Sequence, residues 1–246
     1  MKSNLLLGVG FVAALARPAS ASDSYGAKSY PRGEIRKLIV ETDSGAITLA
    51  GSGDGTAFVD VAPAALPGDD CRVSQVLRGG TLRLTARAPR AFLGAAKTCS
   101  AGFAVSGAFE LIEARTRSGA VVLRGATGVL RLFSGSGSIS GDAPGSRVEA
   151  NTGSGDVTLG SLSGIAAVRT GSGNVSLTWI SAPKSGKIEV RTGSGDLTAA
   201  FPPSTNLKTD FRSGSGKLRG GAPGGAAPLT LVFRSGSGGA TIGAGR

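Results

Sequence analysis

The stretch Thr152-Gly153-Ser154-Gly155-Asp156-Val157-Thr158-Leu159 decides the fold, because the second half of the chain repeats its pattern. Complete Gly-Ser-Gly tripeptides end at residues 137, 155, 173, 195, 216 and 238, and the variant Arg117-Ser118-Gly119 begins the series. The steps between the last glycines are 18, 18, 18, 22, 21 and 22 residues. A fixed period of roughly 20 residues is typical of solenoid proteins, in which each repeat forms one coil.

Alignment on these glycines places like residues in columns. The strand expected before each turn supplies one apolar column, and the strand after it supplies a second. The columns are Ala114, Leu132, Ala150, Val168, Val190, Phe211 and Phe233, and Val121, Ile139, Val157, Val175, Leu197, Leu218 and Ala240. Because side chains alternate across a strand, both columns are expected to face inward. The repeats therefore predict an all-β fold, a right-handed parallel β-helix of about 18–22 residues per coil whose like strands pair from coil to coil.

The last glycine of each complete turn is predicted to be structural. These glycines are Gly137, Gly155, Gly173, Gly195, Gly216 and Gly238. A side chain at a stacked corner would meet its copy about 4.8 Å away in the next coil. Glycine avoids this crowding and also permits positive φ angles. The Ser and Thr hydroxyls beside the turns are expected to bond to backbone groups of the turn.

The start of the chain has the pattern of an export signal. Lys2 precedes an apolar stretch from Leu5 to Leu15, and Ala19-Ser20-Ala21 offers a cleavage site, so residues 1–21 are predicted to be a cleaved signal peptide. The apolar stretch is too short to span a bilayer, and no later stretch is long enough. We therefore expect an exported protein, periplasmic or at the cell surface, without a transmembrane segment in the mature chain. A retained N-terminal anchor is the alternative.

The rest of the chain divides into three parts. Residues 22–34 are expected to form a flexible leader, 35–102 an N-terminal β region with an irregular insert near 63–79, and 103–246 the regular repeats. Residues 35–246 would form one continuous domain. Cys71 and Cys99 are the only cysteines, and in an exported chain they are expected to form one disulfide within the N-terminal region. Two buried free thiols are the alternative.

The net charge favours an anionic environment. The chain holds 27 Lys and Arg against 16 Asp and Glu, which gives +11. Acidic polysaccharide and envelope glycolipid are the partners that this charge suggests, although solubility alone also explains it. Nucleic acid is disfavoured by the export signal and by an aromatic content of only 5%.

Histidine is absent, which removes the usual base of nucleophilic triads and the commonest metal ligand. The acids that could act in a polysaccharide-cleaving solenoid are Asp156 and Asp196, with Asn174 between them in the column after the turn. The competing interpretation is that these short side chains stabilise the turns. Calcium-binding repeats need Asp in nearly every repeat, whereas this column also contains Ala120 and Lys217. We expect no cofactor and no metal.

The candidate binding residues form an outward row that we call the arginine column. Its members are Arg115, Arg169, Arg191, Arg212 and Arg234, and Phe133 and Asn151 interrupt it. Stacked guanidinium groups can bind repeated phosphates or carboxylates. Acids stand two residues earlier on the same face, at Glu113, Glu149, Glu189 and Asp210. They could instead pair with the arginines and make an ordinary solvated surface, so both interpretations stay open.

Taken together, these motifs resemble a known family. Thr81-Leu82-Arg83-Leu84, the repeated Thr-Gly-Ser-Gly-Asp units and the segment from Leu197 to Pro203 are similar to the bacterial putative-adhesin β-solenoid family, over about residues 35–243. This is a domain of largely unknown function, related to the head domain of putative auto-transporter adhesins. The resemblance implies an exported right-handed parallel β-helix and supplies no catalytic motif.

From these observations we expect a non-enzymatic envelope protein whose rigid solenoid presents a charged face for binding. The alternatives are a polysaccharide lyase or hydrolase on the same scaffold, and a structural spacer without a ligand. The oligomeric state stays open, because the end coils of a solenoid expose strand edges that can pair with another chain.

Overall fold

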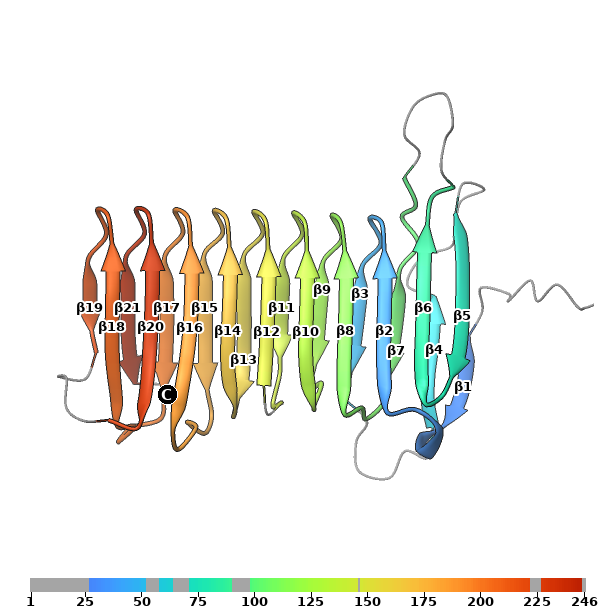
Figure 1. The fold of residues 1–246 in the computed structure, drawn as a ribbon, viewed down its shortest axis with the longest axis horizontal. Helices are drawn as coiled ribbons and strands as arrows, with labels where there is room; N and C mark the ends of the chain where they lie inside the picture. Colours follow the sequence, from blue (N-terminus) through green and yellow to red (C-terminus); the bar gives the residue numbers. More distant parts are fainter. Residues whose placement is uncertain are drawn as a thin grey trace, which may run out of the picture.

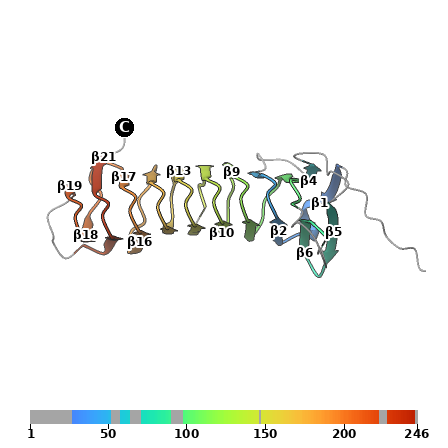
Figure 2. The same cartoon turned by 90° about the horizontal axis from the view of Figure 1, so that it is seen from above.

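The structure is a computed structural model that describes residues 27–51, 58–63, 71–89, 98–145, 147–221 and 227–244. The predicted signal peptide lies outside these residues. Within them, the strands form two long sheets that face each other across a narrow interior (Figures 1 and 2). We call the sheet nearer the viewer in Figure 1 the front sheet and the other the back sheet.

In spatial order, the front sheet holds β18 (Leu207–Ser213), β20 (Leu229–Ser235), β16 (Gly186–Thr192), β14 (Ile165–Thr170), β12 (Arg147–Thr152), β10 (Val129–Ser134), β8 (Leu111–Thr116), β2 (Lys37–Thr42), β6 (Thr81–Arg87) and β5 (Arg72–Arg78). The back sheet holds β1 (Lys28–Pro31), β4 (Phe58–Pro63), β7 (Phe103–Ser106), β3 (Ile47–Ala50), β9 (Val121–Arg124), β11 (Ile139–Asp142), β13 (Val157–Leu162), β15 (Val175–Trp179), β17 (Leu197–Phe201), β21 (Ala240–Ala244) and β19 (Leu218–Gly220). One short 3₁₀ helix, η1 (Arg32–Glu34), follows β1.

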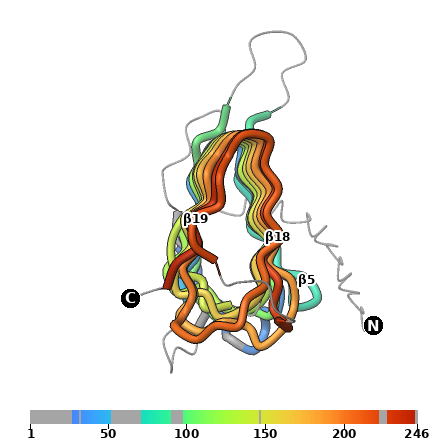
Figure 3. The backbone as a smooth tube through the Cα atoms, turned by 90° about the vertical axis from the view of Figure 1, so that its left-hand side faces the viewer, coloured from blue at the N-terminus to red at the C-terminus, as the bar shows by residue number. Residues whose placement is uncertain are grey.

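The regular part of the chain is the predicted parallel β-helix. Each coil rises along a front strand, turns, and descends along a back strand, and the path from β8 to β17 moves steadily along the rod in a right-handed sense (Figure 1). Like positions pair in parallel register, as Ala150 does with Leu132 and Val168 on either side. Seen along the rod, successive coils superpose closely (Figure 3). The expected fold class is confirmed.

The hydroxyl at the end of each front strand explains the Thr-Gly-Ser-Gly motif. Thr170 accepts a hydrogen bond from the N–H of Gly173 at 3.0 Å and donates one to the carbonyl of Gly155 in the preceding coil at 3.2 Å. Thr152 makes the same pair of bonds with Gly155 and Gly137, both at 3.1 Å. Both hydroxyls therefore close their own turn, as predicted, and in addition tie it to the neighbouring coil.

The last glycine of the turn is required because the neighbouring backbone occupies the space of a side chain. A Cβ on Gly173 would lie 2.0 Å from the carbonyl oxygen of Gly155, and one on Gly155 would lie 2.2 Å from that of Gly137. Both distances are far below van der Waals contact, so any larger residue must push two coils apart. Steric contact between coils thus fixes the glycine at this position, and no positive φ is recorded at either residue.

The core is one continuous column of apolar side chains between the sheets. The two columns read from the sequence are buried along most of their length, which includes Leu132, Val168 and Val190 at 0% exposure. Aromatic residues fill the opposite corner of the later coils, where Trp179 stacks on Phe201 with ring centroids 4.4 Å apart. The Trp179 indole N–H donates to the carbonyl of Gly164 at 2.9 Å, which satisfies its polar atom.

Both ends of the rod depart from sequence order. At the C-terminal end the last coil, β20 and β21, lies between the coil of β16 and β17 and the coil of β18 and β19. At the other end β2 and β3 lie between the coil of β6 and β7 and the coil of β8 and β9. The expectation that like strands pair in sequence order is therefore wrong at the ends. β20 brings Leu229, Leu231 and Phe233 inward, whereas β18 has Thr209 at the middle position, so the more apolar coil takes the interior place.

The N-terminal end is extended by antiparallel strands. β5 pairs with β6, while β4 pairs with β7 and β1 pairs with β4. The expected flexible leader at 22–34 is corrected for its described part, because β1 and η1 occupy residues 28–34 and Tyr30 is only 6% exposed. The irregular insert near 63–79 is corrected likewise, since residues 72–78 form β5. Cys71 and Cys99 are joined by a disulfide, with Cα atoms 5.0 Å apart.

Candidate binding face

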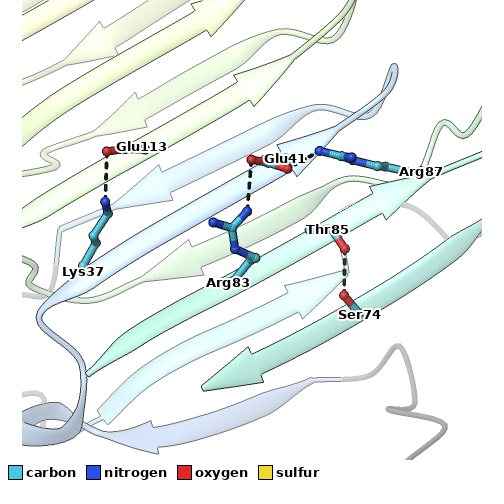
Figure 4. Close-up of polar contacts among 7 residues, drawn as sticks. All are labelled: Lys37, Glu41, Ser74, Arg83, Thr85, Arg87 and Glu113. Atoms are coloured by element: carbon cyan, nitrogen blue, oxygen red, sulfur yellow. Dashed lines mark hydrogen bonds and ion pairs between the residues drawn. The ribbon is translucent and has the colours of Figure 1, made fainter. Parts of the chain in front are cut away.

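Charged side chains cover the outer surface of the front sheet and pair from strand to strand. In the N-terminal half, Lys37 and Arg131 both approach Glu113, with nitrogen–oxygen distances of 3.1 and 3.3 Å. Arg83 and Arg87 likewise converge on Glu41 (Figure 4). In this half of the sheet each of the two acids is shared by two cations, so its charge is fully compensated within the protein.

Two acids of this surface titrate below their ordinary range. Burial raises the pKa of the Glu113 carboxyl, but hydrogen bonds and charges from Lys37 and Arg131 outweigh burial and hold the pKa below its ordinary value of 4.5. The same balance holds for Glu189, where burial opposes the hydrogen bonds and charges of its two cations and the pKa is again lowered from 4.5. Both acids are therefore ionised at neutral pH. Each offsets the positive charge of the lysine and arginine side chains beside it.

Three members of the arginine column are engaged by acids. Arg191 pairs with Glu189, two residues before it on β16. Arg212 and Arg234 both reach Asp210, with nitrogen–oxygen distances of 3.5 and 3.2 Å. The shared acid follows from the coil exchange, because β18 and β20 are neighbours and β20 has Val232 at the acidic position. For these three arginines the structure shows the ion pairs that are expected of an ordinary solvated charged surface.

A fourth member, Arg115, lies over an aromatic ring. Its Cζ atom is 4.5 Å from the centroid of the Phe133 ring on the next strand, a distance at which the ring face attracts a cation. Phe133 is half-buried and Arg115 is exposed. The aromatic interruption of the column is thus part of the surface, because it orients one arginine without neutralising it.

The fifth member, Arg169, has no ion-pair or hydrogen-bond partner in the part of the chain that the structure describes. The reason lies in its own strand, because β14 carries Ala167 where its neighbours β12 and β16 carry Glu149 and Glu189. Its register partners are Asn151 on one side and Arg191 on the other. Glu149 stands diagonally across the strand pair from Arg169, and no ion pair joins the two among the described residues.

An open groove of about 530 Å³ crosses the face at this point. It runs over β10, β12, β14 and β16, and its walls include Phe133, Asn151, Arg169 and Arg191. The turn glycines Gly153, Gly171 and Gly193 line it further, and because they have no side chains they leave the strand ends uncovered. None of the described residues that line the groove is acidic. The arginines were predicted from the sequence but the groove was not, because it depends on which short side chains, such as Asn151 and the turn glycines, become neighbours in space.

The acids of the other candidate site serve the turns on the back sheet. Asp156 Oδ1 accepts the N–H of Asn174 at 2.7 Å, Asn174 Oδ1 accepts that of Asp196 at 3.0 Å, and Asp196 Oδ1 accepts that of Gly239 at 2.7 Å. Each side chain thus bonds to the backbone of the next coil in space. This ladder is the turn-stabilising role that the sequence analysis set against catalysis.

Two grooves border this ladder. One, of about 320 Å³, is lined by Asp156 and Asp196 with neutral residues between them. The other, of about 460 Å³, lies nearer the C-terminal end, where Asp196 shares the lining with Lys217 and Arg219. Within the described ranges, no three Cys, Asp or Glu side chains gather closely enough to hold a metal ion. No helix in the same ranges is long and apolar enough to cross a membrane.

Parallel coils stacked around a mainly apolar interior are the architecture of a β-solenoid. The family model of Toastrack DUF4097 matches residues 29–222, so the chain belongs to this family. The family resemblance of the repeats is thereby confirmed. Comparison with curated proteins gives no match.

Two solved structures are similar over most of the chain. One is a putative cell adhesion protein from Clostridium sporogenes ATCC 15579, at 13% identity and a TM-score of 0.36, with 89% of this chain and 98% of that one covered. The other is a putative adhesin from Bacteroides fragilis NCTC 9343, at 14% identity and a TM-score of 0.45, with 88% and 95% covered.

Proposed function

We propose that this protein is an exported, non-enzymatic envelope protein that binds sugars bearing carboxylate or phosphate groups in the groove of the front sheet. One observation carries the proposal, namely that Arg169 is exposed, has no acid partner among the described residues and lines that groove. Export is supported by the signal-like residues 1–21 and by the Cys71–Cys99 disulfide, which suits an oxidising compartment.

The groove offers the groups that an anionic sugar needs. The Arg169 guanidinium can donate two parallel hydrogen bonds to one carboxylate or phosphate. The Asn151 amide can both donate to and accept from ring hydroxyls, and the Phe133 ring adds an apolar wall. Strands repeat at about 4.8 Å, so Phe133 and Arg191 stand about 14 Å apart across the groove. That span accommodates several groups of a chain laid along the rod.

The positive charge of the whole chain supports the same class of ligand. A formal net charge of +11 attracts polyanions over several ångströms, and such attraction weakens as salt screens it. Carboxylated polysaccharide and phosphorylated glycolipid share this anionic sugar chemistry. The experiment below includes both as separate arms.

A polysaccharide lyase or hydrolase is the second candidate, and one observation favours it. Asp196 shares a groove with Lys217 and Arg219, so an acid and two bases border the same depression of the back sheet. The first candidate is preferred because Asp196 Oδ1 already accepts the Gly239 N–H. An acid that binds the backbone of a neighbouring coil is held as part of the corner and is poorly placed for proton transfer to a ligand.

The test measures binding to polygalacturonate, to lipid A vesicles and to neutral dextran by isothermal titration calorimetry at two salt concentrations. The wild type is expected to bind one of the two anionic probes, more weakly at higher salt, and to leave dextran unbound. Arg169→Ala is expected to weaken binding about tenfold, as the loss of a charged hydrogen-bonding group would. Arg234→Ala is the matched control, because that arginine is already held by Asp210, and it should change affinity less than about threefold.

Two results would contradict the proposal. The groove is excluded as the site if Arg169→Ala binds the anionic probe as tightly as the wild type while both variants keep their thermal stability. A steady rise in reducing ends, or in the ultraviolet absorbance of an unsaturated uronate, would replace binding with cleavage. In that case Lys217→Ala should abolish turnover and Arg169→Ala should leave it intact.

A further inference from the structure

The C-terminal end of the rod leaves two strand edges without a neighbour. Among the described residues, β18 and β19 end the two sheets, and each pairs with one strand only. At the opposite end antiparallel β1, β4 and β5 extend beyond the last parallel coil. Figure 1 shows the parallel coil of β18 and β19 at one end of the rod and β1 and β5 at the other. Strand edges of this kind are templates for pairing with another strand.

The last coil also has an unfinished core. The Thr209 hydroxyl points into the interior of β18, where its oxygen is buried and has no hydrogen-bond partner among the described residues. Phe211 is half-buried although Phe233, on which it stacks, is fully buried. Leu218 on β19 is 38% exposed. A buried hydroxyl without a partner and apolar side chains at the end both favour a further layer over this coil.

The order of the charged residues along β18 indicates which partner supplies that layer. Lys208 and Asp210 point outward on either side of the inward Thr209. In an antiparallel pairing of β18 with its own copy, centred on Thr209, each Lys208 lies opposite Asp210 of the other copy. The two Thr209 hydroxyls then face each other, and Leu207 lies opposite Phe211. We propose that the C-terminal end is a homodimer interface, in which two copies join tail to tail through β18 in this register.

The strand is self-complementary, which favours a second copy over an unrelated partner. A two-fold axis makes both charge pairs from one lysine and one acid per chain, and opposite charges directly across a strand pair stabilise it. Thr209 finds a partner for its hydroxyl in the same step, because Thr–Thr hydrogen bonds form across paired strands. A two-fold contact uses the same edge of both copies, so the arrangement is tail to tail and stops at two copies.

The dimer would also have a consequence for the binding face. A two-fold axis perpendicular to the sheets keeps both front sheets on the same side of the dimer. Two copies of the arginine column then stand end to end on one surface, and a long polymer can contact both. The proposal itself rests on the end geometry alone and stands or falls independently of the proposed ligand.

The first test is sedimentation velocity on the mature chain over a wide range of concentrations. The mature chain is expected to shift toward twice its monomer mass as concentration rises. Lys208→Asp places like charges at both cross-strand pairs and should raise the dimer dissociation constant at least about tenfold. Lys184→Asp makes the same charge change at an exposed lysine away from β18 and should leave the dimer unchanged. A wild type that stays monomeric, or equal effects of the two variants, would overturn the proposal.

The second test examines the register. In Thr209→Cys the two new thiols should lie opposite each other, so mild oxidation should link two chains through residue 209, which peptide mass mapping can identify. Lys184→Cys is the control and should not form a linked dimer. A dimer that forms while Thr209→Cys fails to cross-link would show a different interface and would also overturn the proposal.

Discussion

Phe233 of β20 stacks on Phe211 of β18 with ring centroids 5.6 Å apart, and the residue later in the sequence lies nearer the middle of the rod. Phe233 is also in register with Val190 of β16, so it is enclosed on both sides. Phe211 has a neighbouring strand on one side only. The exchange of the last two coils therefore decides which of two equivalent phenylalanines is a core residue.

The exchange predicts unequal costs for two matched substitutions. Phe233→Ala should destabilise the protein by about 3–5 kcal/mol, as for a fully buried aromatic residue. Phe211→Ala removes a half-buried ring and should cost about 1–2 kcal/mol. Urea unfolding followed by circular dichroism measures both. If the coils stacked in sequence order, Phe233 would be terminal and the order of the two values would be reversed.

The corner contact predicts a steric penalty at Gly173. Gly173→Ala puts a Cβ 2.0 Å from the Gly155 carbonyl oxygen, so two coils must separate and stability should fall by more than about 2 kcal/mol. Ser172→Ala changes the exposed residue just before it and should stay within about 0.5 kcal/mol of the wild type. Thermal unfolding of the two variants checks the difference, and equal melting temperatures would contradict the corner contact.

The hydroxyl ladder predicts that Thr170 acts through its oxygen. Thr170→Val keeps the shape but leaves the Gly173 N–H and the Gly155 carbonyl without this partner, at a cost of about 1–3 kcal/mol. Thr170→Ser keeps the hydroxyl and should lose much less, because Ser134 holds the equivalent place on β10. Equal losses in the two variants, measured by urea unfolding, would assign the effect to packing.

The lowered pKa values of Glu113 and Glu189 predict that the stability of the fold depends on pH. A carboxyl with a lower pKa in the folded protein stabilises the fold above its ordinary pKa of 4.5, and this gain is lost as pH falls from there through the folded pKa. Glu189→Gln should therefore be less stable than the wild type at pH 7, by under about 1 kcal/mol. The difference should be smaller at pH 3, which lies below the ordinary pKa of 4.5. Melting temperatures at the two pH values measure it, and a constant difference would point to a cause other than charge.

The position of Glu149 predicts that removing its negative charge strengthens binding of an anionic ligand. This acid lies diagonally across from Arg169, at about 7–8 Å between strands, and no ion pair joins them among the described residues. Glu149→Gln removes a negative charge beside the groove and should tighten binding of the anionic probe by about two- to fivefold at low salt. Asp142→Asn, on the back sheet, is the control and should have little effect. Unchanged affinity in Glu149→Gln would place the ligand elsewhere.

Much of the fold could be predicted from local pattern. Thr170, Gly173 and Val175 recur at one-coil spacing and have the same roles in most coils, so a single repeat defines the turn glycine, the hydroxyl that closes the turn and the inward side chain. The arginine column was visible for the same reason. The leader could not be assigned correctly, because β1 is a strand only through its pairing with β4, and nothing within residues 28–31 alone requires it.

The sequence by itself determined that the chain winds into a right-handed rod of stacked coils, because a repeated motif makes the same local contacts wherever it occurs. Only the tertiary structure decided the order of the coils at each end. All coils share one register, so like strands can pair in more than one order, and burial of the more apolar coil selects among them. The structure also decided which members of the arginine column pair with an acid among the described residues, because the nearest acid to each guanidinium depends on which strands are neighbours in space.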